Sequence, residues 1–72
     1  MVEKNSKDVA TEMLIASRTN LLAMEIKERY FSQQSILAKS REYEMMLGKT
    51  QAEIRETRKL ISFLDNYIKE LG

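Results

Sequence analysis

Acidic side chains are the residues of this sequence that could carry out acid–base chemistry. The chain of 72 residues holds 11 Asp and Glu residues and no His, so two carboxylates would have to act as general acid and general base. Such a pair needs burial or a like-charged neighbour to separate its pKa values. Glu25 and Glu28 instead stand beside Lys27 and Arg29, which is typical of a solvated charged face. We therefore expect a protein that is not an enzyme.

Metal and phosphate sites also lack their usual residues. The absence of Cys and His removes thiolate zinc sites and the commonest metal ligand, and a diiron site in a helical bundle would need Glu-x-x-His pairs. The segment Gly48–Thr50 resembles the end of a phosphate-binding loop, but the upstream Gly is absent and residues 45–47 cannot form the amide cradle. The sequence predicts no catalytic residue, no metal and no cofactor.

The charge pattern indicates neither a nucleic-acid partner nor a membrane span. The formal net charge is +1 and both signs are interleaved along the chain, whereas a nucleic-acid binder concentrates basic residues on one face. No apolar run approaches the roughly 20 residues of a membrane span. Residues 1–8 are polar and lack the apolar core of a signal peptide. We expect a cytoplasmic protein.

Large flexible and aromatic side chains are therefore interpreted as packing residues or interface anchors. Methionine can line an adaptable binding surface, but its default role is to fill a core. Aromatic side chains can stack on bases, yet without a basic stripe beside them they are expected to pack or to anchor an interface. The residues concerned are Met13, Met24, Met45, Met46, Tyr30, Phe31, Tyr43, Phe63 and Tyr67.

Nearly the whole chain favours helix. It has no Pro and only two Gly residues, and residues of good helix propensity dominate. Residues 1–6 are expected to be disordered, with Asn5 or Ser6 as the helix cap. A helical pattern then runs from about Lys7 to Leu47. Residues 27–35 have a weaker pattern, where a kink and a continuous helix both stay open, and the absence of Gly and Pro favours continuity.

Gly48 and Thr50 predict the position of the turn. Gly48 fits the left-handed position just past a helix end, and Thr50 and Glu53 have the spacing of a capping box. A helix end followed at once by a helix start predicts antiparallel neighbours. The predicted fold is all-α: one domain over residues 1–72, an antiparallel helical hairpin with a long first helix, a capped turn near Gly48–Thr50, and a shorter second helix.

The second predicted helix, from Thr50 to about Leu71, has the most regular apolar pattern. Its heptad seam is predicted to face the first helix and contains Ile54, Ile61, Leu64 and Ile68. Further apolar residues widen this face to about half of the circumference, more than one antiparallel neighbour covers. Uncovered apolar surface marks an interaction site. The predicted partner-binding surface comprises Leu60, Phe63 and Tyr67 with Leu14, Leu21, Met24 and Phe31 of the first helix.

Chain length supports the prediction of a protein partner. A domain this short buries only about 60% of the surface that its unfolded chain exposes, and without Cys it has no disulfide to stabilise it. Association with another subunit supplies the missing apolar burial. We expect the isolated protein to be a homo-oligomer or to be marginally stable.

The chain resembles the small co-chaperones of bacterial type III secretion, the group that includes YscE, PscE, EscE and SsaE. The resemblance rests on the length, the long helical arm, the segment Gly48–Thr50, the heptad second arm and the lack of Cys, and it covers nearly the whole chain. It implies that the protein binds and stabilises a larger tetratricopeptide-like chaperone, and that the pair keeps a needle subunit unpolymerised in the cytosol. Two alternatives stay open: a self-associating hairpin that acts as adaptor or scaffold, and a secreted helical filament subunit.

Overall fold

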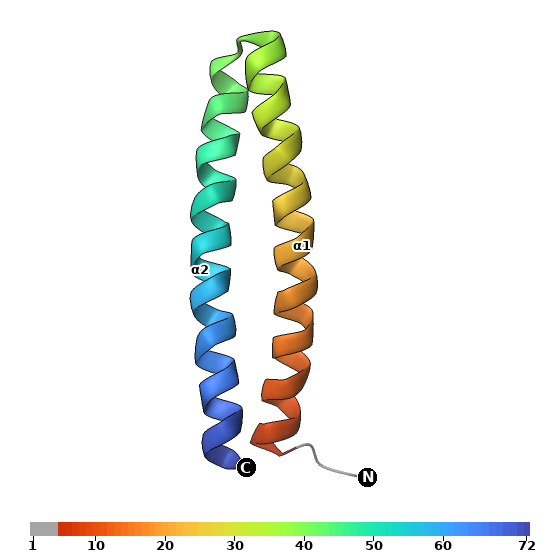
Figure 1. Cartoon of the computed structure of the whole chain (residues 1–72), viewed down its shortest axis with the longest axis vertical. Coiled ribbons are helices and arrows are strands. Elements are labelled where there is room, and N and C mark those ends of the chain that lie inside the picture. Colours follow the sequence, from red (N-terminus) through yellow and green to blue (C-terminus); the bar gives the residue numbers. More distant parts are fainter. Residues whose placement is uncertain (1–4) are drawn as a thin grey trace.

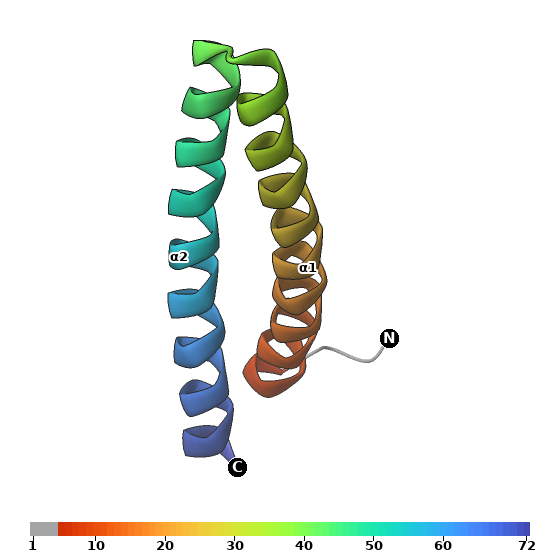
Figure 2. The same ribbon diagram turned by 45° about the horizontal axis from the view of Figure 1, so that its top comes forward.

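The protein is a pair of long antiparallel helices. The computed structural model describes residues 5–72, which form α1 (Ser6–Ala38) and α2 (Arg41–Leu71). The helices lie side by side over nearly their whole lengths (Figure 1), and they remain so when the view is turned (Figure 2). The predicted all-α antiparallel hairpin is confirmed. Its extents of 52 × 24 × 13 Å correspond to a single layer of two helices.

The predicted position of the turn is wrong. Lys39 and Ser40 connect the helices, and α2 runs through Gly48 without a break. The helices have 33 and 31 residues, so the expected long and short arms are nearly equal. Lys39, with φ 49° and ψ 37°, takes the left-handed conformation expected of Gly48. No glycine of the described residues has a positive φ.

Burial explains why α2 begins early. Tyr43 and Leu47 are half-buried and Thr50 is only 6% exposed, because they precede Ile54 at helical spacing and extend its seam by three turns. Burial of a large apolar side chain stabilises by about 1.5–3 kcal/mol. A helical Gly costs only about 1 kcal/mol relative to Ala. The free energy gained by burying Tyr43 and Leu47 therefore exceeds the cost of placing Gly48 inside a helix.

The start of α1 follows from its capping residue. The backbone N–H of Asp8 donates a hydrogen bond of 2.9 Å to Oδ1 of Asn5, which confirms Asn5 as the cap. Asp8 also places a negative charge near the positive end of the helix dipole. Asn5 and Ser6 were expected to be disordered, but they form the cap and the first residue of α1; residues 1–4 lie outside the described residues. Residues 27–35 lie within α1, so the continuous helix is confirmed.

The core is a narrow seam between the helices. Ala10 and Leu14 of α1 and Leu64 of α2 form its buried cluster. Ile54 is buried as well, and Ile61, Tyr67 and Ile68 pack against the cluster. The predicted seam of Ile54, Ile61, Leu64 and Ile68 is thus confirmed. Within the described part of the chain no large side chain is completely buried, so this seam leaves much apolar surface open to solvent.

Candidate protein-binding surface

One long edge of the helix pair is polar. Arg18 of α1 lies 3.4 Å from Asp65 of α2, and Glu25 of α1 lies 3.7 Å from Arg58 of α2, measured between guanidinium nitrogen and carboxylate oxygen. Arg18 and Glu25 are seven residues apart on α1, which is about two helical turns. Asp65 and Arg58 are likewise seven residues apart on α2, so the two ion pairs line the same edge. All four side chains are exposed, and such pairs contribute at most about 1 kcal/mol each. Their main effect is to make this edge hydrophilic.

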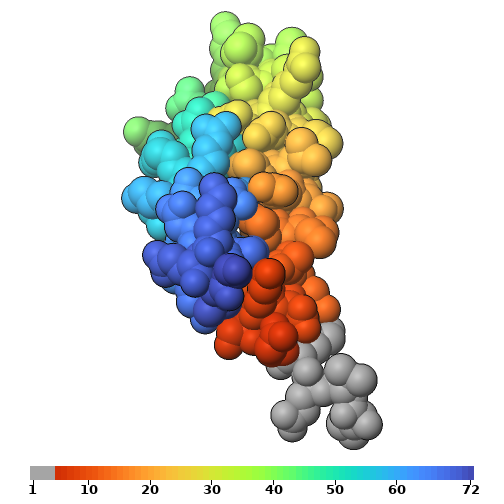
Figure 3. Space-filling view, turned by 60° about the horizontal axis from the view of Figure 1, so that its bottom comes forward, coloured from red at the N-terminus to blue at the C-terminus, as the bar shows by residue number. Residues whose placement is uncertain are grey.

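The opposite edge is apolar where the termini meet. Side chains of the first turns of α1 and the last turns of α2 enclose a groove of about 380 Å³. Figure 3 shows these segments side by side, α1 in red and α2 in blue. We call this feature the open-end groove and define it by Val9, Met13, Leu60, Phe63 and Tyr67. Four of them are exposed and Tyr67 is half-buried.

Sequence spacing places the groove away from the ion pairs. Asp65 directly follows the seam residue Leu64, whereas Leu60 directly precedes the seam residue Ile61. Because one residue turns the helix by about 100°, the two positions flank the seam on opposite sides. The rings of Phe63 and Tyr67 lie parallel on the apolar side, with centroids 5.8 Å apart and an interplanar angle of 14°. The stacked pair gives the groove a rigid aromatic wall.

The structure brings together only some of the predicted partner-binding residues. Leu60, Phe63 and Tyr67 line the open-end groove. The prediction for Leu14 is wrong, because it is 8% exposed and lies inside the seam.

The other three predicted residues, Leu21, Met24 and Phe31, are half-buried along α1. Met24 faces α2, since its Sδ accepts a 4.0 Å hydrogen bond from the Thr57 hydroxyl. They therefore lie along the seam rather than in the groove.

Val9 and Met13 are groove residues that the sequence prediction missed. They are four residues apart, one turn of a helix, and both are exposed at the start of α1. In the sequence they form an apolar pair at helical spacing, which could have indicated a shared exposed surface. The turn at Lys39 and Ser40 brings Phe63 of α2 beside this pair, so that all three residues line the groove.

An aromatic cluster closes the end of the hairpin next to the turn. The ring centroids of Tyr30 and Phe31 are 5.6 Å apart, and each lies 6.4 Å from that of Tyr43. The neighbouring charge of an ionised Tyr30 and its hydrogen bond raise the pKa of Tyr43 above the ordinary value of 10. Both phenols take part in the ring packing at this end, which is one of the two roles that the sequence predicts for them.

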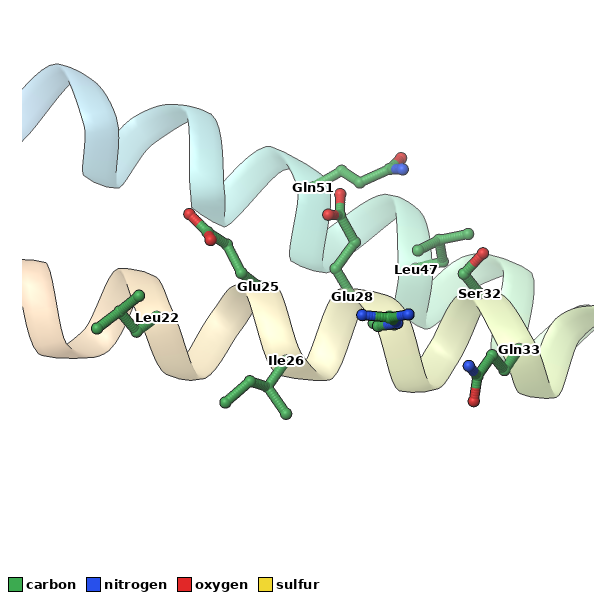
Figure 4. Close-up of a pocket in the computed structure, with 9 residues that line it drawn as sticks. Leu22, Glu25, Ile26, Glu28, Ser32, Gln33, Leu47 and Gln51 are labelled. Carbon is green, nitrogen blue, oxygen red and sulfur yellow. The ribbon is translucent and has the colours of Figure 1, made fainter.

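A second apolar surface lies on the outer side of α1. Leu22 and Ile26 are exposed there, and both border a shallow hollow that extends to Leu47 and Gln51 of α2. Figure 4 shows Ile26 on the side of α1 that faces away from α2. The sequence interpretation assigned no role to this surface.

The structure of residues 5–72 shows neither a metal-binding cluster nor a membrane-spanning helix. Residues 5–72 contain no group of three or more His, Cys, Asp or Glu that could hold a metal ion. Over the same range, neither helix has the length and apolar character needed to cross a membrane. No protein-family model, curated protein or solved structure matches the chain. The candidate site is therefore defined by its apolar surfaces alone.

Proposed function

We propose that the protein is a binding module that docks on a larger helical protein through the open-end groove. The observation that carries the proposal is the exposed apolar cluster on one edge of a hairpin whose other edge carries ion pairs. Full burial of each large apolar side chain is worth about 1.5–3 kcal/mol, and a stacked aromatic pair at the centre of a patch is a typical hot spot. A partner that covers the groove gains this energy.

The shape of the groove favours a helix as the docking element. It runs between two antiparallel helices, its walls are apolar, and Asn5 and Ser6 form a polar margin. An amphipathic helix fits such a groove by inserting its apolar face. Helical-repeat proteins present helices of this kind along their surfaces. This geometry supports the tetratricopeptide-like partner that the resemblance implies.

The full proposal is a co-chaperone of type III secretion. Its partner would be a tetratricopeptide-like chaperone, its client a needle subunit kept unpolymerised, and its location the bacterial cytoplasm. The hairpin of 72 residues without Cys and the confirmed heptad seam of α2 support this assignment. The segment Gly48–Thr50 no longer supports it, because that segment lies inside α2.

Replacement of Phe63 tests the groove. Co-purification of the tagged protein from its native cell and mass spectrometry identify the partner, whose affinity is then measured by calorimetry. Phe63→Ala should weaken binding at least about 30-fold, the equivalent of a 2 kcal/mol hot spot. Lys59→Ala should change the affinity less than about threefold, because Lys59 is exposed and pairs with Glu56 on its own helix.

Circular dichroism separates docking from folding. Phe63 is 61% exposed, so Phe63→Ala should keep its helicity, and lost binding with retained helicity supports the groove. Loss of both would assign Phe63 to the fold, and unchanged binding would remove the groove from the proposal. A partner without helical repeats would leave the binding module in place and refute the co-chaperone assignment.

A further inference from the structure

Five exposed apolar residues form a stripe along the outer side of α1. We call it the outer stripe; it comprises Ile15, Leu22, Ile26, Tyr30 and Leu37. Their exposed fractions lie between 51 and 77%. At about 100° per residue all five fall within an arc of about 80°, with Ile26 at its centre. The stripe spans about 33 Å of helix.

The fold uses only Tyr30 of this stripe, whose ring packs against Tyr43 of α2. Ile26 points away from α2 (Figure 4), so the second helix of the hairpin cannot cover it. The groove contains no residue of the stripe. An apolar stripe on a helix normally faces a neighbouring element. By this criterion α1 lacks a neighbour on its outer side.

The spacing of the stripe is symmetric about Ile26. Leu22 and Tyr30 stand four residues before and after it, and Ile15 and Leu37 stand eleven residues before and after it. In an antiparallel pair of identical helices related by a two-fold axis, positions equally far before and after the centre share a layer. A second α1 would therefore set Ile15 level with Leu37, Leu22 level with Tyr30, and Ile26 level with itself. The same arc also contains Thr19 and Gln33, seven residues before and after Ile26, so the pair has apolar layers and one polar layer in each half.

The elongated hairpin exposes more surface than a compact monomer of its mass. A compact monomer with the mass of residues 5–72 exposes about 4,400 Å². The whole chain exposes 5898 Å², and a fully extended tetrapeptide accounts for at most about 700 Å² of this. The excess is about 800 Å², the area that each partner buries in a specific interface of standard size.

Charges beside the stripe also fit a second antiparallel copy. Glu25 and Arg29 lie on the same flank of the stripe, on either side of its centre. The two-fold axis brings Arg29 of the second copy onto the flank of Glu25, about 3 Å away along the helix axis. Two such pairs form by symmetry, and antiparallel helices also oppose their dipoles favourably.

We propose that a second copy of this chain covers the outer stripe. The dimer is a layer of four helices with the two α1 helices at its centre, packed antiparallel about Ile26, and with one α2 on each outer side. Each α1 then has a helix on both of its apolar sides. The open-end groove stays accessible in this dimer.

Sedimentation equilibrium of the full chain tests the interface. The wild type should dimerise reversibly at concentrations up to about 200 µM, and Ile26→Glu, which sets two carboxylates against each other, should raise the dimer Kd at least about 100-fold. Met45→Glu is the matched control, because Met45 is as exposed as Ile26 (71%) but lies on α2. It should change the Kd less than about threefold. A monomeric wild type, or an equal effect of both substitutions, would overturn the proposal.

Cysteine cross-linking tests the antiparallel register. The natural chain has no Cys, so an introduced thiol can form a disulfide only with the thiol introduced in another copy. Ile26→Cys should oxidise to a disulfide-linked dimer. A mixture of Leu22→Cys and Tyr30→Cys should cross-link to each other far better than either does to itself. Self-linkage of Leu22→Cys in preference to the mixed product would indicate parallel helices and refute the arrangement. Because these variants add no charge, they also decide the outcome if Ile26→Glu loses helicity.

Discussion

Gly48→Ala should stabilise the protein, because Gly48 lies in the interior of α2. A β-carbon added at Gly48 meets no atom within 4 Å, and the residue has no positive φ. Ala therefore brings its better helix propensity, about 1 kcal/mol over Gly, without a steric cost. No apolar burial adds to this value, since position 48 is exposed. The expected gain is about 1 kcal/mol, or about 4–8 °C in Tm for a domain of this size.

Urea unfolding followed by circular dichroism measures this gain. Protein concentrations below the dimer Kd keep association out of the free energy of unfolding. The reverse substitution Ala52→Gly is the control, because residue 52 is exposed one turn further along α2. It should destabilise by about 1 kcal/mol. The double variant should therefore have nearly the stability of the wild type.

The opposite result would refute the position of the turn. If Gly48 ended a helix in the left-handed conformation, a β-carbon there would cost about 1–2 kcal/mol. Gly48→Ala would then lower the Tm by several degrees. The sign of the change therefore decides between a turn at Lys39–Ser40 and the turn that the sequence predicts at Gly48–Thr50.

Two further stability predictions follow from the turn and the seam. Lys39→Gly should stabilise by about 0.5 kcal/mol in urea unfolding, because relief of the left-handed conformation outweighs the greater entropy of Gly in the unfolded chain; Lys39→Ala, which keeps a β-carbon, should show no gain. Leu64→Ala should destabilise by about 2–5 kcal/mol in the same assay, since Leu64 is 3% exposed in the seam cluster. A loss below about 1 kcal/mol, the range of a surface position, would contradict its core role.

The sequence predicted the fold class and the seam of α2 because both depend on patterns that extend over many residues. Ile54, Ile61 and Ile68 repeat over two heptads and so define one face of the helix. The cap at Asn5 was also predictable, since it depends on one side chain and the nearest backbone N–H groups. These features need no knowledge of where the chain reverses.

The position of the turn could not be read from local signals. It depends on which pairing of the two helices, with a turn at Lys39–Ser40 or at Gly48–Thr50, buries more apolar surface. Gly48 and Thr50 carry a strong local preference for a turn, whereas at the actual turn only Ser40, the N-cap of α2, is of a type favoured at a helix start. The seam residues Tyr43 and Leu47 decide the outcome only when they meet α1. The turn at Lys39 and Ser40 places Phe63 beside Val9 and Met13 in the open-end groove, and the sequence prediction did not include these two residues.

The open-end groove and the outer stripe share no residue, and this separation has a consequence for assembly. A partner in the groove contacts the edge of the hairpin that carries Phe63, whereas a second copy contacts the side of α1 opposite α2. Neither event covers the surface that the other needs. The two proposals together therefore predict a complex with two copies of this chain and two of its partner. Ile26→Glu should reduce this complex to one copy of each without weakening the groove, and Phe63→Ala should release the partner while the dimer of this chain persists.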